Sequence, residues 1–436
     1  MTTVSLSAVC RKIALRIIPF LFLCYVLNFL DRVNIGFAKL QFLHDLNMSE
    51  AVFGIATGFF FLAYATFEIP SNLLLARIGA RQTLMRIMLL WGLATIAQMF
   101  VTNPKGLYFV RFLLGAAEAG FYPGVILYLS YWFPDAVRAR ANGILGLAVP
   151  IAGIAGGPLS GWIMTSLQGT AGLRGWQWLF LLEGIPAVLV GLAAPLALKN
   201  RPEDASWLSD AERRTLRQAL DAGTASALTH DHAPLWRLFC DTRVASLAGI
   251  YFCVYIGLAA VTFWSPTVLK EAGVASLGAI GWLSGLISLI TMLANLLIAF
   301  SSDRRKERRW HLSGCLLATA ASLVALKFAQ GNVVATVSLL AIAQSAMYSV
   351  PIVFWTIPAR TFAGRKAAAG IALISALGSL GGAASSWMVG ALSARTGSLN
   401  AGLEAVAGVL VFGTVLLLWF APRDHARDAE AVTQTV

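Results

Sequence analysis

Charged residues are scarce in this sequence: Asp, Glu, Lys and Arg make up only 12% of its 436 residues, whereas 58% are hydrophobic. Soluble domains carry about twice that share of charge, because their surface faces water. The composition therefore argues against two or three ordinary soluble domains and indicates a protein whose surface faces lipid.

Cysteine and histidine are also few, with five of each. The cysteines fall in apolar segments or on the expected inner side of a membrane, so they are interpreted as packing residues rather than disulfide partners. They are Cys10, Cys24, Cys240, Cys253 and Cys315. The histidines lie outside the apolar segments or at their ends, which argues against haem ligation and an intramembrane metal enzyme. We expect no metal and no cofactor.

Long apolar runs are abundant, and each approaches the ~20 residues that a helix needs to cross hydrocarbon. Lipid-facing irregular backbone would leave peptide groups unpaired, so the runs predict an all-α membrane protein with twelve transmembrane helices. The runs are 13–36, 51–75, 83–101, 107–132, 142–166, 176–198, 245–268, 278–301, 312–329, 333–357, 367–392 and 402–421. The first lacks a small-residue cleavage site and is interpreted as an uncleaved helix rather than a signal peptide.

The net charge of +12 could indicate nucleic-acid binding. The positions of the Lys and Arg residues instead indicate membrane topology. With the N-terminus inside, the inner segments hold most Lys and Arg residues. The outer loops hold only Lys39, Lys105, Arg174, Lys270, Lys327 and Arg395. We therefore expect both termini in the cytoplasm, a lipid bilayer as a partner and no nucleic acid. We also expect a monomer.

A polar stretch at 199–244 divides the apolar runs six and six. It predicts an N-terminal half at 1–198, a cytoplasmic linker at 199–244, a C-terminal half at 245–422 and a cytoplasmic tail at 423–436. Ser209 and Glu212 in the linker have the spacing of a capping box before a short amphipathic helix. A basic loop follows the second run of each half, which suggests duplicated halves with a site between them, as in many transporters. Alternatively, any inner loop attracts arginine.

Several charged residues fall inside the predicted spans, where an isolated charge costs ~3 kcal/mol even by lenient scales. They are Asp31, Arg32, Glu68, Arg111, Glu118 and Glu183. Such residues usually line a wet cavity, form pairs or function in transport. Glu68 lies beside Pro70 and is interpreted as structural. For Glu183, a structural and a functional interpretation both stay open.

Two polar stripes are predicted by helical spacing. Arg111 and Glu118 are two turns apart, about 10 Å along one helix face, and Tyr122 extends that face. Tyr25, Asn28 and Arg32 form a second stripe, and Asp31 lies about 100° around the helix from Arg32. If the stripes face each other, they form a polar cavity.

Arginine and carboxylate side chains together can bind an anion and a proton. A guanidinium binds a carboxylate through parallel hydrogen bonds, and a buried carboxylic acid in a wet cavity can take up and release protons. The set therefore predicts a proton-coupled anion carrier. The alternative is that Asp31 and Arg32 only neutralise neighbours and that Arg111 extends to the outer interface. An enzyme is not expected, because no paired nucleophile and base stands out.

Several motifs resemble those of the major facilitator superfamily, and within it the anion:cation symporter family, over nearly the whole chain. They are NFLDRVNIGFAKLQF, EIPSNLLLARIGAR, RFLLGAAEAGFYPGVILYLSYWFP and GWQWLFLLEGIPA. The first-half motifs are most similar to the tartrate, phthalate, hydroxyphenylacetate and nicotinate permease branch. The resemblance implies proton-coupled uptake of a small organic anion by alternating access in a bacterial inner membrane. Proton-coupled efflux and a non-transporting nutrient sensor are the alternatives.

The resemblance also implies roles for single residues. Asp31 and Glu118 are expected to couple protons, with Arg32 as a charge partner and Arg111 as a contact of the substrate carboxylate. The expected substrate-binding set is Tyr25, Asn28, Arg32, Tyr64, Arg111, Tyr122, Trp355, Ser375 and Ser379, and the gating set is Arg77, Arg81, Asp303 and Arg304. The chain departs from the family at Ala76, where an acidic residue is usual, and at Ser375 and Ser379, where relatives commonly have asparagine.

Overall fold

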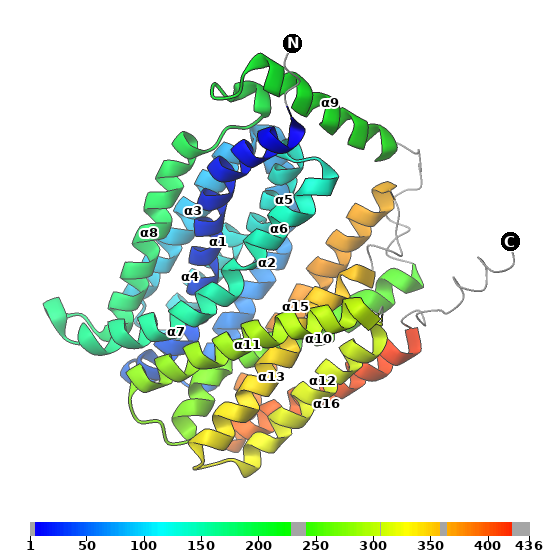
Figure 1. Cartoon of the computed structure of the whole chain (residues 1–436). Coiled ribbons are helices and arrows are strands. Elements are labelled where there is room, and N and C mark those ends of the chain that lie inside the picture. Colours follow the sequence, from blue (N-terminus) through cyan, green and yellow to red (C-terminus); the bar gives the residue numbers. More distant parts are fainter. Residues whose placement is uncertain (1–4, 228–240, 306, 358–363, 421–436) are drawn as a thin grey trace, which may run out of the picture. The chain divides into compact units, whose positions relative to one another are not determined.

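The computed structural model describes residues 5–227, 241–305, 307–357 and 364–420, and within these ranges every regular element is a helix (Figure 1). The α-helices are α1 Leu6–Asp45, α2 Glu50–Ile78, α3 Ala80–Ala97, α4 Pro104–Glu118, α5 Phe121–Trp132, α6 Asp135–Gly146, α7 Ala148–Ser166, α8 Gly175–Ala197, α9 Asp210–Ala227, α10 Thr242–Glu271, α11 Leu277–Arg305, α12 Arg309–Ala325, α13 Val333–Phe354, α15 Gly364–Thr396 and α16 Leu399–Phe420. Short 3₁₀ turns are η1 Gln98–Phe100, η2 Thr170–Gly172, η3 Pro202–Asp204 and η5 Leu326–Phe328.

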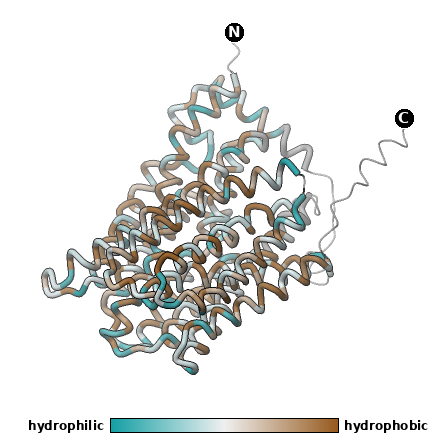
Figure 2. The backbone as a smooth tube through the Cα atoms, turned by 60° about the horizontal axis from the view of Figure 1, so that its bottom comes forward, coloured by the Kyte–Doolittle hydropathy of each residue, from teal (hydrophilic) through white to brown (hydrophobic). Residues whose placement is uncertain are grey.

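Within the described ranges, twelve helical segments are long and apolar enough to cross a membrane, which confirms the predicted fold class. Large apolar side chains point outward from them, including Leu189, Leu196, Leu297 and Trp419. Figure 2 shows hydrophobic colour along these helices, with hydrophilic colour more frequent at their ends and connections. Such an apolar surface is unfavourable in water, whereas it is favourable in contact with the hydrocarbon of lipids.

The helices group into two compact units. Unit 1 contains α1 to α9 and the part of α11 up to Leu286, and unit 2 contains α10, α11 from Ile287, and α12 to α16. In unit 1, α3 packs along α8, α2 along α4, and α1 along α7 and α8. In unit 2, α10 packs against α15 and α16, and α12 packs against α13 and α16.

The predicted fourth span, 107–132, is divided into two helices. α4 ends at Glu118, and α5 begins at Phe121 after Gly120, whose φ of 84° favours glycine. A Cβ at Gly120 would lie 2.6 Å from Ser71 Oγ, so glycine is also needed for space. The prediction that Tyr122 continues the α4 face is therefore wrong, because the helix breaks between them.

The first helix is longer than its apolar run predicts, since α1 continues to Asp45. Lys39, expected in an outer loop, lies inside this helix and is only 1% exposed. Its Nζ atom pairs with Glu50 Oε2 at 3.1 Å and lies 4.5 Å from the Phe53 ring centroid. The loop assignment of Lys39 is wrong, because an ion pair and an aromatic ring keep this cation within the bundle.

The first part of the linker is folded rather than extended. The Ser209 backbone N–H donates to Glu212 Oε2 at 2.8 Å, and the Glu212 backbone N–H donates to Ser209 Oγ at 3.3 Å. The predicted capping box of α9 is thus confirmed. Lys12 Nζ pairs with Glu212 at 2.8 Å, and the Trp207 ring stacks on Trp132 at 5.9 Å. α9 therefore docks on unit 1 where α1 begins (Figure 1).

Candidate functional site

Glu118, the last residue of α4, is the centre of a buried polar cluster in unit 1. Its side chain is fully buried, and its Oε1 atom accepts hydrogen bonds from Asn28 Nδ2 and Arg32 Nε, each at 2.6 Å. Arg32 Nη2 also lies 2.6 Å from Oε1. Asn28 and Arg32 both belong to α1, so the polar stripe of α1 faces Glu118 of α4.

The second oxygen of Glu118 is chemically distinct from the first. Oε2 is buried and accepts no hydrogen bond from the described residues. A proton can therefore add to Oε2 without displacing Asn28 or Arg32 from Oε1. Protonation would remove the negative charge that attracts Arg32 and so weaken the ion pair.

Asp31 faces a different helix from its neighbour Arg32. It is 6% exposed, and its Oδ1 atom accepts a hydrogen bond from Thr95 Oγ1 of α3 at 2.9 Å. Asp31 also lies within electrostatic range of Glu118 and Arg111. The two chain neighbours thus do not simply neutralise each other, because each binds a partner on a separate helix.

Arg111 is buried within unit 1, where its side chain is 2% exposed. The alternative interpretation, an arginine extended to the outer interface, is therefore wrong. Its guanidinium carbon lies 4.7 Å from the Phe60 ring centroid, and its Nε atom has no hydrogen-bond partner among the described residues. The described part of the chain also gives Arg111 no carboxylate at ion-pair distance. A guanidinium in this state retains donors for an incoming anion.

Aromatic rings hold the two arginines in the cluster. The Arg32 guanidinium carbon lies 5.1 Å from the Tyr64 ring centroid and 5.8 Å from that of Phe60, so Phe60 contacts both cations. α4 can approach α2 this closely because residue 115 is glycine: a Cβ there would collide with the Phe60 carbonyl oxygen. These cation–π contacts partly replace the hydration that the arginines lose.

Tyr25 and Tyr122 extend the cluster along α1 and α5. Their rings stack with centroids 5.4 Å apart, and Tyr25 also meets Phe29 edge-on at 5.3 Å. Tyr122 is thus brought to the α1 stripe by stacking, although it does not continue the α4 face. Its side chain remains 44% exposed.

The expected unit 2 residues lie directly after α13, in the case of Trp355, and on α15, in the case of Ser375 and Ser379. Trp355 Nε1 donates to Tyr251 Oη at 3.0 Å, and the Tyr251 ring packs against Gly378 of α15. Ser375 and Ser379 flank this glycine on α15. Ser379 is buried and donates its Oγ proton to the Ala376 carbonyl oxygen, whereas Ser375 is half-buried.

The expected gating residues lie at helix ends. Arg77 and Arg304 are exposed, and the Arg81 backbone N–H donates to Asn200 Oδ1 at 3.0 Å. Asp303 belongs to α11, but its side chain lies outside the described part, so its role in gating stays a prediction. Among the residues the structure describes, no group of His, Cys, Asp and Glu is placed to hold a metal ion.

The model of the family described as Major Facilitator Superfamily matches residues 21–279. The chain belongs to the major facilitator superfamily. It is 42% identical over 415 residues to the "Putative tartrate transporter" of Agrobacterium vitis and 41% identical over 412 residues to the "Putative metabolite transport protein NicT" of Pseudomonas putida, with 94% of each chain covered in both cases. The "Quinolone resistance transporter" of Acinetobacter baumannii is 38% identical, again with 94% of each chain covered.

The solved structure of a D-xylose-proton symporter matches with a TM-score of 0.73 at 17% identity, covering 94% of this chain and 98% of that one. At this identity the match shows the fold alone. This major facilitator protein is accordingly a multi-pass membrane transporter of small molecules, and it is not an enzyme.

Sequence reasoning missed three residues of the cluster in this major facilitator chain: Thr95, Phe60 and Gly115. A threonine within a helix usually donates to its own backbone, so nothing in the sequence marks Thr95 as the partner of Asp31. Phe60 is one of 25 phenylalanines. Gly115 stands one turn from Arg111 and Glu118 on α4, and that spacing is a signal that could have identified it as a close-approach position.

Proposed function

We propose that this transporter takes up a small organic anion together with protons. The observation that carries the proposal is the buried ion pair between Arg32 and Glu118, with Arg111 buried in the same cluster and given no carboxylate at ion-pair distance by the described residues. A second buried guanidinium in this state has a place for an additional carboxylate. The Glu118 carboxylate then supplies the group that exchanges protons.

Arg111 is the proposed contact of the substrate carboxylate. Its guanidinium is fixed over the Phe60 ring, which leaves its planar edge for hydrogen bonds. Substrate binding would place a carboxylate at ion-pair distance from this cation, which the described residues do not do. Tyr25, Asn28, Tyr64 and Tyr122 are proposed to complete the unit 1 contacts. Trp355, Ser375 and Ser379 are also proposed as substrate contacts.

Proton coupling follows from competition for Arg32. When Glu118 is ionised, it holds Arg32 through two short contacts to Oε1. A proton on Oε2 weakens this attraction, so Arg32 becomes available to the substrate anion. Asp31, held by Thr95, is proposed as the second proton-exchanging acid. Release of the proton restores the ion pair and expels the anion.

The energetics favour such coupling. Moving one negative charge into a cell with a negative interior costs ~2.3 kcal/mol per 100 mV, and a proton carried with each carboxylate cancels this cost. The names of two relatives, a tartrate transporter and a metabolite transport protein, support a small anionic metabolite as cargo. All three relatives are bacterial, which supports a bacterial inner membrane, with both termini in the cytoplasm and a monomer working by alternating access.

Proton-coupled efflux is the second candidate, because one relative of 38% identity is named a quinolone resistance transporter. In that case the buried carboxylates would bind a cationic or zwitterionic drug. Arg32 and Arg111 disfavour this candidate, since each would repel the cationic group of such a drug.

The direction and the cargo can be tested in one experiment. The purified protein is reconstituted in liposomes that enclose a pH-sensitive dye, and tartrate, a sugar acid, phthalate, nicotinate and hydroxyphenylacetate are added outside. Acidification of the lumen after addition of one of these anions is expected. If none of the five anions changes the pH of the lumen and a quinolone does drive proton movement, the proposal of anion uptake would be replaced by that of drug efflux. Binding of an anion without proton movement or counterflow would indicate a sensor.

A further inference from the structure

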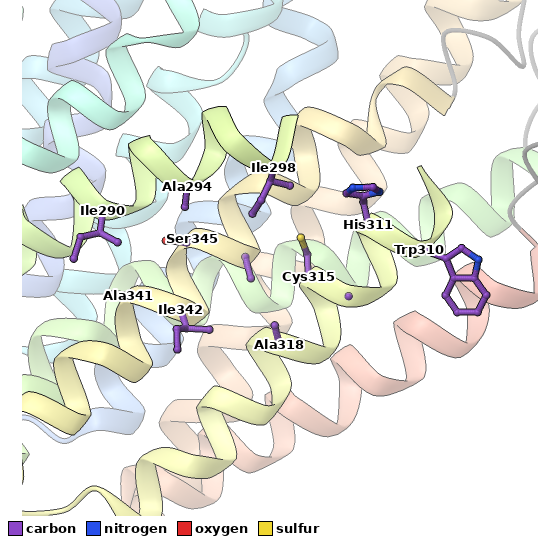
Figure 3. Close-up of a pocket in the computed structure, with 12 residues that line it drawn as sticks. Ile290, Ala294, Ile298, Trp310, His311, Cys315, Ala318, Ala341, Ile342 and Ser345 are labelled. Carbon is purple, nitrogen blue, oxygen red and sulfur yellow. The ribbon is translucent and has the colours of Figure 1, made fainter. Parts of the chain in front are cut away.

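A groove lies on the outward face of unit 2, between α11, α12 and α13 (Figure 3). Its volume is about 510 Å³, and its lining is almost wholly apolar. Ile290, Ala294 and Ile298 of α11 form one wall, and Ala341 and Ile342 of α13 form another. The groove is separate from the polar cluster, all of which belongs to unit 1.

Small residues make the groove hollow. Gly314 and Ala318 of α12 form its floor, and a Cβ built at Gly314 would have no heavy atom within 4 Å. Ile290 and Ile342 on the two rims are 39% and 50% exposed. In a membrane this exposed apolar surface is covered by hydrocarbon rather than by water.

One end of the groove is basic. His311, at the start of α12, lies at this end, and its Nε2 atom is 3.1 Å from Ser301 Oγ of α11 (Figure 3). Ile290, Ala294 and Ile298 repeat every four residues along α11, and Arg305 follows seven residues after Ile298, on the same face. Arg305 is exposed, and the described residues give it no ion pair.

The neighbouring charges leave this end positive. In the sequence, residues 303–309 carry five cations and two acids, which are Arg304, Arg305, Lys306, Arg308 and Arg309 against Asp303 and Glu307. Glu307 already accepts the Trp310 and His311 backbone N–H groups at 2.5 and 3.1 Å, and its Oε2 atom lies 2.7 Å from His311 Nδ1. Trp310 is 66% exposed beside them, and tryptophan favours the level of lipid headgroups.

We propose that the groove binds an anionic phospholipid of the surrounding membrane, with an acyl chain between α11, α12 and α13 and the phosphate at Arg305. An apolar slot that ends at the exposed Arg305 and Trp310 matches both parts of such a lipid. The acyl chain contributes to binding by burying its methylene groups, and the headgroup contributes by its attraction to the arginine. A zwitterionic lipid gains the first contribution but less of the second.

The test uses delipidated, purified full-length protein in detergent, mixed with phosphatidylglycerol or with phosphatidylcholine of identical chains, and measured by native mass spectrometry. Wild type is expected to retain phosphatidylglycerol about fivefold over phosphatidylcholine, which corresponds to one arginine contact. Gly314→Phe fills the slot and is expected to lower retention of both lipids about tenfold, since two or more methylenes lose their site. Arg305→Gln is expected to remove only the preference for phosphatidylglycerol.

Gly408→Phe is the matched control. Gly408 is also an exposed helical glycine of unit 2 with no heavy atom within 4 Å of a built Cβ, but it does not line the groove. Equal retention by the two phenylalanine variants would overturn the lipid site. Equal retention of the two lipids by wild type would overturn the phosphate contact. A protein dimer lost only in Gly314→Phe would assign the groove to a second copy of the chain instead.

Discussion

Arg32 and Glu118 form an ion pair across two helices, with Arg32 Nε and Nη2 both 2.6 Å from the same oxygen, Oε1, of Glu118. Arg32 thus binds an acid 86 residues away, although Asp31 is its neighbour in the chain. The pair concentrates both donors on one oxygen and leaves Oε2 without a hydrogen bond from the described residues. Changes at this one carboxylate should therefore separate proton coupling from substrate binding.

Glu118→Gln is expected to abolish substrate-driven proton uptake while retaining exchange of substrate. Glutamine keeps an oxygen acceptor for Asn28 and Arg32, but it cannot take up a proton. Proton uptake in liposomes and counterflow of labelled substrate at equal pH on both sides measure the two activities. Glu404→Gln, at the peripheral pair with Lys327, is the control and should change neither. Unaltered proton uptake in Glu118→Gln would remove Glu118 from the coupling mechanism.

Arg111→Lys is expected to raise the KM for uptake by roughly 10- to 100-fold, because one charge-assisted hydrogen bond contributes about 1.5–3 kcal/mol. Lysine keeps the positive charge but loses the planar pair of donors that binds a carboxylate. Initial rates of labelled-substrate uptake give KM, and the amount of folded protein is compared by size-exclusion chromatography. Arg395→Lys, at an exposed position on α15, is the matched control. An unchanged KM in Arg111→Lys would assign the substrate carboxylate to another residue.

The sequence predicts the membrane fold and part of the cluster because those signals are local. Apolar length identifies the spans, and spacings of three, four and seven place Arg111 with Glu118 and Asn28 with Arg32. The capping box of α9 is equally local, since Ser209 and Glu212 belong to one turn. Each of these predictions needs only the geometry of a single helix.

The remaining features depend on contacts between helices. Thr95 binds Asp31 only because α3 lies beside α1, and Phe60 contacts two arginines only because α4 approaches α2 at Gly115. The sequence predicts a loop at Lys39 because the first apolar run ends at residue 36. The burial of Lys39 depends on Glu50 and Phe53, which belong to the next helix. Side-chain pairing of this kind has no periodicity in the sequence.

Gly115→Ala is expected to lower the thermal stability of the purified protein in detergent. A Cβ at this position collides with the Phe60 carbonyl oxygen, and such overpacking costs about 1–3 kcal/mol. Gly408→Ala is the control, because alanine gains the same helix propensity there and its Cβ meets open space. Thermal unfolding followed by the loss of monodisperse protein provides the comparison. Equal melting temperatures for the two variants would show that α4 can move away from α2 without cost.

The docking of α9 on α1 is expected to depend on pH through Glu212. The hydrogen bond from Lys12 lowers the pKa of the Glu212 carboxyl below its ordinary value, and the Ser209 backbone N–H lowers it further. A group with a lowered pKa stabilises the folded form at any pH above its ordinary value, and this stabilisation is lost as pH falls through the lowered value. Docking should therefore be complete at neutral pH and weaken below about pH 4.3, the ordinary pKa of glutamate.

Amide hydrogen exchange of α9, corrected for the intrinsic exchange rate at each pH, measures this docking. Glu212→Gln is expected to raise exchange in α9 at neutral pH by about two- to fivefold, the range that a solvent-accessible ion pair contributes. Wild type should approach the exchange of the variant as the solution is acidified. Glu203→Gln is the control, because Glu203 lies 3.9 Å from Arg217 in an exposed pair on the same linker. If wild type and Glu212→Gln exchange equally at neutral pH, the stacking of Trp207 on Trp132 holds α9 without the ion pair.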